Sequence, residues 1–242
     1  EGTEFLGYAR QVSEQFGLLQ DRYIGKEVKR RFSVSTQHYT FAVNAFIETV
    51  KRKGIDSYEF AIHETKTGEV IDNVKNFKSE IGVLYISDFN QQVIMKMLRE
   101  NNLEFVELFA CDTYVYLWAG HPLAGKKILN MKELEKYPCL AFDQGNNNSF
   151  YLAEEMKSTY DYKRIIKAND RATLLNLMVG LNAYTLCSGI ICEELNGDGY
   201  KALPLKESEK MRIGYIKRRA SKLSSTGEIY VEELKKYENQ VM

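Results

Sequence analysis

Residues 31–63 read RFSVSTQHYTFAVNAFIETVKRKGIDSYEFAIH, and this stretch decides the predicted fold. Apolar and polar residues alternate over 31–35, which predicts a half-buried strand. Apolar residues then recur at helical spacing over 39–53, and Gly54 marks the end of that helix. A second strand is predicted over 58–63. This order of strand, helix and strand is typical of a βαβ unit with parallel strands.

The same alternation continues to the end of the chain. It predicts further helices at 68–78, 89–101, 131–137, 149–158, 171–180, 188–196 and 226–238. It predicts further strands at 80–86, 104–109, 113–119, 139–142, 163–167, 183–187, 200–205 and 211–217. Ser87 with Asp88 is a candidate cap for the helix 89–101, and Ser149 for the helix 149–158. We therefore expect an α/β protein with mostly parallel sheets.

The pattern restarts after the turn at 121–125, which predicts a second lobe. The last strand and helix are too little for a third domain, so we expect them to return to the first lobe. The chain then divides into a connector helix (1–27), lobe I (28–114 plus 206–242) and lobe II (115–205). Two crossing segments, near 111–116 and 203–208, join two Rossmann-like lobes. Ligands of such sheets bind at the carboxyl ends of the strands, which face a shared cleft.

Composition narrows the class of protein. The 33 basic residues balance the 33 acidic ones, so this chain lacks the basic excess that is typical of a nucleic-acid-binding domain. The four cysteines form no CxxC pair and lie away from the three histidines, which predicts reduced thiols, a cytoplasmic protein, no metal and no cofactor. We find no membrane-spanning run. Because residue 1 is Glu, we expect a fragment of a longer protein.

A narrow apolar stripe marks the first helix, predicted over 3–22. Its members recur close to heptad spacing: Phe5, Tyr8, Ala9, Val12, Phe16 and Leu19. Such a stripe predicts a connector that packs on a partner. The alternative is a helix that packs on its own domain.

Five motifs together resemble a known family. They are RFSVSTQHY (31–39), KSEIGVLYIS (78–87), HPLAGK (121–126), YPCLAFDQG (137–145) and LLNLMVGLNAYTLCSGI (174–190). In this order and spacing the chain resembles the effector-binding domain of LysR-type transcriptional regulators. Two departures are visible. The acidic residue common in the family after Gly82 and its apolar neighbour is absent, and Asn182 replaces the usual second glycine of a G-x-G pair.

The resemblance implies a periplasmic-binding-protein type 2-like fold and a ligand-sensing function. It implies a small-molecule effector in the cleft, either a small carboxylate or another polar metabolite. It also implies a homodimer or tetramer in which helices 39–53 and 89–101 face their counterparts, with promoter DNA bound only through a winged helix-turn-helix absent from this fragment. The alternative function is the solute-binding protein of a transporter with the same fold.

The candidate ligand-binding residues of lobe I follow its strands. They are Ser35, Thr36, Gln37 and His38 after the first strand, Thr65 and Lys66 after the second, and Tyr85 at the end of the third. Backbone N–H groups at the start of a helix favour an anion there. The alternatives are N-capping by Ser35 or Thr36, an exposed loop histidine, a solvated lysine and a packed tyrosine.

The candidates of lobe II are mostly neutral polar groups. They are Gln144, Asn148, Ser149, Phe150, Asp170, Thr185, Cys187 and Ser188. Groups of this kind orient a small polar ligand. The alternatives are turn chemistry in the loop, N-capping by Asp170, and core packing of the cysteines rather than a redox pair of Cys187 and Cys192.

Catalytic motifs are missing from the sequence. It contains no G-x-S-x-G elbow, no Walker loop and no paired histidine ligands. The adjacent Glu154 and Glu155 are interpreted as a solvated helix face. We therefore expect no enzyme activity and assign no catalytic or metal-binding residue.

Overall fold

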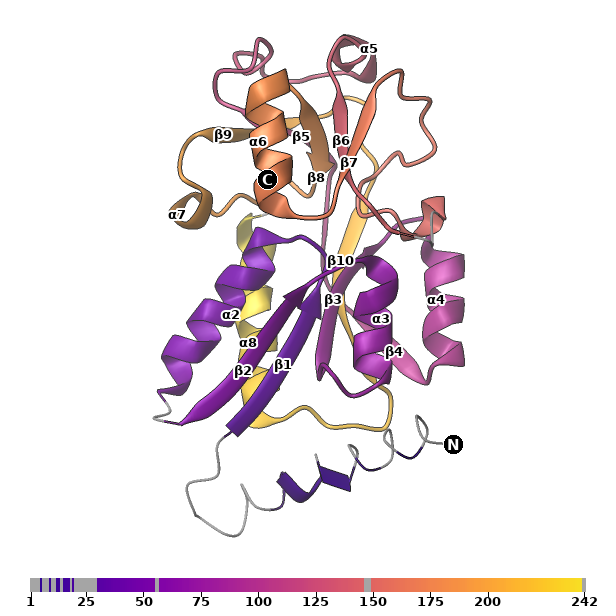
Figure 1. Cartoon of the computed structure of the whole chain (residues 1–242), viewed down its shortest axis with the longest axis vertical. Coiled ribbons are helices and arrows are strands. Elements are labelled where there is room, and N and C mark those ends of the chain that lie inside the picture. The colour runs from indigo at the N-terminus through magenta and orange to yellow at the C-terminus, as the bar shows by residue number, and fades with distance from the viewer. Residues whose placement is uncertain are drawn as a thin grey trace.

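The computed structural model describes residues 30–54, 57–145 and 149–240, together with eight positions between 5 and 19. Two sheets, each covered by its own helices, form two lobes that follow one another along the long axis of the molecule (Figure 1). This arrangement confirms the predicted α/β fold class with two lobes. No helix among the described residues is both long and apolar enough to cross a bilayer.

Lobe I is built on a five-stranded sheet in the order β2-β1-β3-β10-β4. The strands are β1 (Arg30–Thr36), β2 (Tyr58–Glu64), β3 (Ile81–Ile86), β4 (Leu103–Cys111) and β10 (Met211–Arg218). β10 runs antiparallel to both of its neighbours, so the sheet is mixed, and the other four strands run in one direction, in agreement with the predicted mostly parallel sheet.

The helices of lobe I cover both faces of this sheet. They are α2 (Thr40–Lys53), α3 (Thr67–Lys75), α4 (Gln91–Glu100) and α8 (Ser225–Lys235), which continues as a 3-10 turn at Lys236–Gln240. Figure 1 shows α2 and α8 on one side of the sheet and α3 and α4 on the other. Consecutive residues of β3 therefore point to opposite faces of the sheet and enter two separate apolar cores. Val83 packs in the core beside α2, and Leu84 in the core beside α4.

Lobe II has a second five-stranded sheet, in the order β7-β6-β8-β5-β9. Its strands are β5 (Tyr114–Trp118), β6 (Cys139–Phe142), β7 (Ile165–Ala168), β8 (Tyr184–Cys187) and β9 (Tyr200–Pro204). Its helices are α5 (Met131–Leu134), α6 (Arg171–Leu181), α7 (Glu193–Asn196) and the 3-10 turn η1 (Phe150–Leu152). This sheet is also mixed, since β5 runs antiparallel to β8 and β9.

Two short segments connect the lobes, between β4 and β5 and between β9 and β10. They are hydrogen-bonded to each other. The Thr113 backbone N–H donates to Ser208 Oγ at 2.8 Å, and Thr113 Oγ1 donates to the Glu209 carbonyl at 2.8 Å. Ser208 Oγ lies 3.1 Å from Asp112 Oδ1. These paired segments are the two places where the chain crosses between the lobes.

Two residues show how local sequence fits this fold. A Cβ on Gly82 would lie 2.7 Å from Ile216 Cγ1 and 2.8 Å from Val70 Cγ1, so only glycine lets α3 pack this closely on β3. Asn182 ends α6 with φ 48°, the left-handed conformation in which asparagine is the usual substitute for glycine. The departure from the G-x-G pair therefore keeps the backbone geometry.

The main error of the sequence prediction lies at 149–158. A helix is predicted there, but the structure has only η1, followed by turns. Ser149 makes no side-chain capping bond. The segment is held against lobe I by polar contacts of Ala153 and Glu154, and such tertiary contacts override helix propensity. The cap of α4 is Asn90, whose Oδ1 accepts from the Ser87 backbone N–H, and not Ser87 or Asp88.

The N-terminal stripe is exposed at the positions that the structure describes. Phe5, Val12, Phe16 and Leu19 belong to helical positions and are each more than half exposed. Tyr8 lies outside the described residues. Packing of this stripe on a partner stays a prediction.

Candidate ligand-binding cleft

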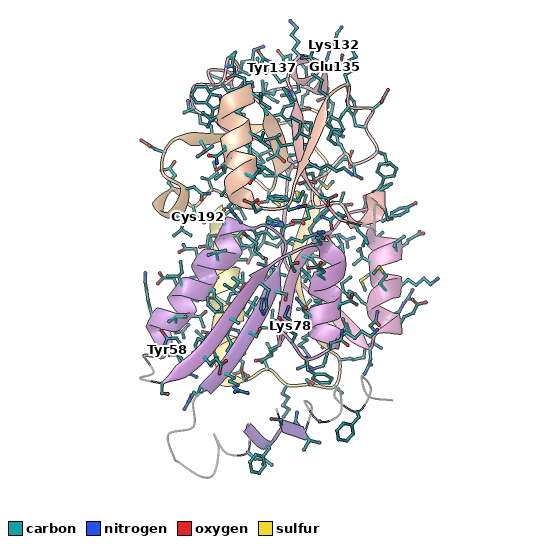
Figure 2. All side chains as sticks on the ribbon, in the orientation of Figure 1. Tyr58, Lys78, Lys132, Glu135, Tyr137 and Cys192 are labelled. Atoms are coloured by element: carbon teal, nitrogen blue, oxygen red, sulfur yellow. The ribbon has the colours of Figure 1, made fainter. Side chains whose placement is uncertain are left out.

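A cavity of about 90 Å³ lies between the lobes, where strand ends of both sheets meet. Lobe I contributes the turn between β1 and α2, and lobe II contributes β5, the end of β8 and the start of α6. A space of this size holds several water molecules, or a small ligand in their place. Figure 2 shows side chains filling both lobes and the band between them, where Cys192 lies, whereas Lys132 and Glu135 lie at the far end of lobe II.

The shortest polar link across the cleft joins His38 to Glu154. Glu154 Oε2 lies 2.8 Å from His38 Nδ1 and accepts from the His38 backbone N–H at 2.9 Å. Because a carboxylate only accepts hydrogen bonds, the ring carries its hydrogen on Nδ1. Both side chains are about 95% buried, and the imidazole stacks on Phe142 with 3.6 Å between ring centroids. Neither residue is a solvated surface group.

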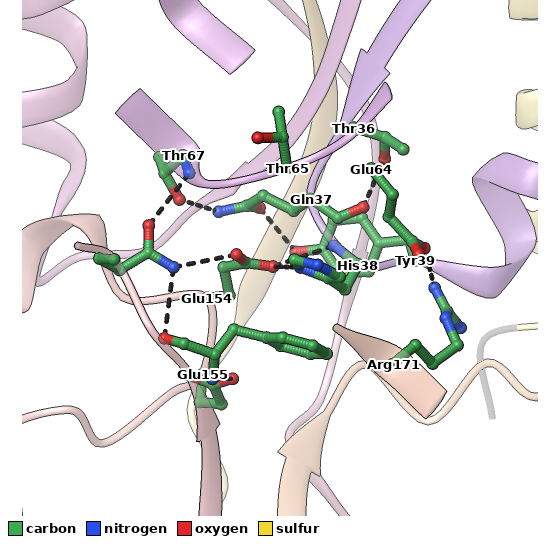
Figure 3. A network of polar contacts seen from close by, with 12 residues as sticks. Thr36, Gln37, His38, Tyr39, Glu64, Thr65, Thr67, Glu154, Glu155 and Arg171 are labelled. Atoms are coloured by element: carbon green, nitrogen blue, oxygen red, sulfur yellow. Dashed lines mark hydrogen bonds and ion pairs between the residues drawn. The ribbon is translucent and has the colours of Figure 1, made fainter. Parts of the chain in front are cut away.

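Gln144 extends this link into a network that spans both lobes (Figure 3). Its Nε2 donates to Glu154 Oε1 at 2.9 Å, and its Oε1 accepts from the Thr67 backbone N–H at 3.1 Å. Thr67 Oγ1 in turn accepts from Gln37 Nε2 at 2.6 Å. Gln37 Oε1 accepts from Tyr39 and from the Tyr85 backbone. The polar atoms of this end of the cleft therefore satisfy one another.

Further contacts hold the lobes together around the network. Arg171, at the start of α6, pairs with Glu64 and donates to Thr40 Oγ1, both in lobe I. The Tyr85 hydroxyl donates to the Ala153 carbonyl at 3.0 Å. Lys66 Nζ lies 4.0 Å from Asp143 Oδ2. The structure therefore shows the lobes in a closed arrangement.

The Thr185 end of the cleft has fewer hydrogen bonds between its polar groups. Thr185 in β8 stands opposite Tyr116 in β5, and both line the cavity. Thr185 is 7% exposed, and its hydroxyl has no hydrogen-bond partner among the described residues. An unpaired buried hydroxyl costs free energy that a ligand atom can recover.

Cys187 and Ser188 line the cavity next to Thr185. Burial raises the pKa of the Cys187 thiol to about 12, so this thiol is protonated and unreactive in the closed arrangement. None of the four cysteines, all of which the structure describes, forms a disulfide.

Glu155 forms a second buried carboxyl group at the cleft. Burial, and after it the neighbouring charge of Glu154, raise its pKa to about 8. Its Oε1 accepts from the Phe142 backbone N–H at 2.8 Å, which opposes the rise. At neutral pH this group is therefore mostly protonated. The interpretation of Glu154 and Glu155 as a solvated helix face is wrong, since both are buried and no helix forms there.

The structure brings many of the candidate residues to this cleft. His38, Thr185, Cys187 and Ser188 line the cavity. Gln37, Lys66, Tyr85 and Gln144 belong to the contacts around it.

Other candidates point elsewhere. Ser35 lies inside lobe I, with its hydroxyl 2.8 Å from Ser79 Oγ, and Thr36 Oγ1 donates to the Gln37 carbonyl. Thr65 bonds to Glu69 on the surface. Ser149 and Phe150 are exposed and away from the cavity.

Asp170 and Asn148 are the remaining candidates. Asp170 caps α6, as the alternative interpretation predicts: its carboxylate accepts from the Thr173 backbone N–H at 2.9 Å, and this bond lowers its pKa. Asn148 lies outside the described residues.

Several cleft residues escape the sequence argument. Glu64, Phe142, Glu154, Glu155 and Arg171 carry contacts across the cleft but are absent from the candidates. The strand-end rule could have found three of them. Phe142 is the last residue of β6, Glu64 is the last residue of β2, and Arg171 is the first residue of α6. Glu154 carries no such signal, because its segment resembles a helix.

Comparison with known proteins decides the family. A family model described as the LysR substrate binding domain matches residues 56–238. The chain belongs to this family. A search of curated protein sequences finds no match for this LysR-type domain.

Solved structures agree with the family in their fold. The LysR-type domain is similar to the effector binding domain of QuiR in complex with shikimate, with 14% identity, a TM-score of 0.58, and coverage of 88% of this chain and 99% of that one. HinK, a LysR family transcriptional regulator from Pseudomonas aeruginosa, has 12% identity and a TM-score of 0.60. The match covers 100% of this chain and 81% of that one. The reduced form of the OxyR regulatory domain from Pseudomonas aeruginosa has 12% identity and a TM-score of 0.61. The match covers 87% of this chain and 99% of that one.

The polar groups of the cleft are of the kinds that bind small molecules. They are amides, hydroxyls, one thiol, one imidazole, one guanidinium and two carboxyl groups, arranged around a small cavity. Within the described residues, no three His, Cys, Asp or Glu side chains gather as metal ligands. Such an arrangement recognises a small molecule by hydrogen bonds and shape.

Proposed function

We propose that this LysR-type domain senses a small polar effector in the cleft between its lobes and acts as a regulator, not as an enzyme. The observation that carries the proposal is the buried Thr185 hydroxyl without a partner among the described residues, at the edge of a cavity between both sheets. The effector binding domain of QuiR, which has a similar fold, was solved in complex with shikimate.

Effector binding acts by shifting the population of lobe arrangements. The two lobes contact one another through His38–Glu154 and Arg171–Glu64, and we expect them to turn about the paired crossing segments. A ligand that binds one arrangement better than the other shifts the equilibrium by its difference in affinity. The shift reaches promoter DNA through a separate DNA-binding domain of a cytoplasmic protein.

Dimer formation uses the two outer helices of lobe I, as the family implies. Figure 1 shows α2 and α4 at opposite edges of this lobe, so an antiparallel pair of lobes brings α2 of one chain to α4 of the other. On α4, Val93 and Met97 are half-buried, whereas Ile94 is fully buried in the core of its own lobe. Val93 and Met97 are therefore the interface candidates. Gel filtration at rising protein concentration tests the dimer.

A thermal-unfolding screen against a library of small polar metabolites, shikimate included, tests the sensing function. We expect at least one compound to raise the unfolding midpoint in a concentration-dependent manner. Thr185→Val should remove the response, and Ser149→Ala, at an exposed position outside the cavity, should keep it. A stabilising compound that acts equally on both variants would place the site elsewhere and contradict the proposal.

A further inference from the structure

The carboxylate of Glu154 occupies a position that an anionic ligand would otherwise take. Three N–H groups point at it: the backbone N–H and Nδ1–H of His38, and Nε2 of Gln144, at 2.8 to 2.9 Å. We call these three donors the carboxylate seat. Glu154 reaches the seat from lobe II, and its side chain is 4% exposed. Three donors hold this charged group in the way that a protein holds a carboxylate ligand, except that Glu154 is covalently part of the chain.

The surroundings of the seat complement a negative charge at this place. The seat lies directly before α2, a helix of 14 residues with no acidic residue in its first turn. The positive end of the helix dipole is therefore complemented from the other lobe. The N-terminus of such a helix attracts an anion, and in the closed arrangement the Glu154 carboxylate takes the place of that anion.

The remaining charges of the cleft disfavour a second anion. The two flanking cations are already paired, Arg171 with Glu64 and Lys66 with Asp143. Glu155 adds a second carboxyl group to the cavity wall. An incoming carboxylate would meet the Glu154 carboxylate and, among the described lining residues, no cation without a counter-charge.

The hydroxyl of Thr185 provides an independent indication of a ligand. It is buried against the cavity and has no partner among the described residues. A hydroxyl both donates and accepts, so it suits an alcohol, an amide or an amine. The carboxyl oxygens of the cavity wall accept hydrogen bonds from the same kinds of group.

We propose that Glu154 is a built-in carboxylate ligand of this cleft, and that the effector is a hydrogen-bond donor that brings no carboxylate to the seat. The second half rests on the proposed sensing function; the first half does not. Glu154 thereby determines specificity: it excludes small carboxylic acids and leaves the Thr185 end of the cavity to uncharged or cationic molecules.

The test removes the tethered carboxylate and supplies a free one. Thermal unfolding is measured in sodium acetate and in sodium chloride at equal ionic strength, for the wild type, Glu154→Ala and Glu154→Gln. In Glu154→Ala the seat is vacant, so acetate should raise the midpoint saturably by about 3 °C or more above chloride. The wild type and Glu154→Gln keep a side chain in the seat, so their midpoints in the two salts should agree within about 1 °C. Glu135→Ala, at a half-buried lobe II surface position paired with Lys163, is the matched control without an acetate response.

Each outcome decides the proposal. An equal acetate response in the wild type shows that the seat is open to exchange and overturns it. No response in Glu154→Ala overturns it as well. If Glu154→Ala does not fold in chloride, acetate should restore its circular-dichroism spectrum, and failure to do so counts against the seat.

The effector half has its own readout, in the metabolite screen. Compounds that stabilise the wild type should lack a carboxylate, and Glu154→Ala should gain carboxylates among its stabilising compounds. A carboxylic acid that stabilises the wild type and loses at least tenfold in affinity when Gln144 is changed to Ala would overturn this half, because it would occupy the seat itself. A screen without any stabilising compound, together with acetate rescue, would reject the sensing function and leave the built-in ligand in place.

Discussion

The two ends of the cleft differ in how completely their polar atoms are paired. At one end, His38, Glu154, Gln144 and Thr67 satisfy one another across the lobes. At the other end, the Thr185 hydroxyl is buried without a partner among the described residues, beside a small cavity. The difference separates two tasks: the paired end holds the closed arrangement, and the unpaired end has binding capacity for a ligand.

The largest effect is expected from His38→Ala at the paired end. This change leaves the buried Glu154 carboxylate without its ring partner and removes the stacking on Phe142. Because breaking a buried pair leaves an uncompensated charge, we expect a loss of about 4 kcal/mol in the free energy of unfolding, measured with urea. Lys163→Ala breaks the more exposed pair with Glu135 and should change stability little. Equal losses in the two variants would remove the distinction between a buried and a surface contact.

A pH dependence is expected from Glu155, which also lines the cavity. The folded pKa of about 8 exceeds the ordinary value of 4.5, so between these values the folded chain holds a proton that the unfolded chain has released. Stability therefore falls as the pH rises through this window. Relative to Glu155→Gln, the wild type should lose about 3 kcal/mol of unfolding free energy between pH 5 and pH 8.

Urea unfolding of both proteins at pH 5, 6.5 and 8 measures this difference. If the unfolding free energy of the wild type rose with pH relative to that of Glu155→Gln, Glu155 would be ionised in the folded chain. Glu135 serves as a comparison, because Lys163 lowers the pKa of its carboxyl group and its removal should not reproduce the trend.

At the unpaired end, Thr185→Val should affect binding and hardly affect folding. Valine has the shape of threonine without the hydroxyl, so the variant should be equally stable or more stable by up to about 1 kcal/mol. Its affinity for a stabilising metabolite should fall about tenfold, the value of one hydrogen bond. Isothermal titration calorimetry measures the affinity. A large loss of stability would show that this hydroxyl has a structural task.

The smallest effect is expected from Ser149→Ala, outside both ends. Ser149 is exposed and makes no capping bond, so neither the unfolding midpoint nor the affinity for a metabolite should change beyond error. Differential scanning fluorimetry with and without the metabolite is sufficient. A lost response would extend the site to the loop before η1.

The regular parts of this molecule were predictable, because they follow from periodicity. The unit over 31–63 forms β1, α2 and β2 within a few residues of the expected bounds, and Gly54 ends α2 in the left-handed conformation. The rule that ligands meet strand ends selects His38, Thr185 and Cys187, which line the cavity, and their role in ligand binding stays a prediction. Periodicity did not reveal the antiparallel β10, since strand direction depends on the return of the chain.

The contacts that close the lobes were not predictable in the same way. Glu154 and Glu155 lie in a segment with helical periodicity, and long-range bonds to His38 and Tyr85 decide its conformation instead. Ser35 was selected by its place in the sequence, but its side chain points into lobe I, because neighbouring residues of a strand alternate between faces. Sequence reasoning found the cleft and missed the residues that fill it.

A crystal structure of the domain with a stabilising metabolite tests the central claim most directly. We predict that the metabolite lies in the inter-lobe cavity within hydrogen-bond distance of Thr185 Oγ1, while Glu154 keeps its contacts with His38 and Gln144. A metabolite bound outside the cleft, or one whose own carboxylate displaces Glu154 from His38, would contradict the account.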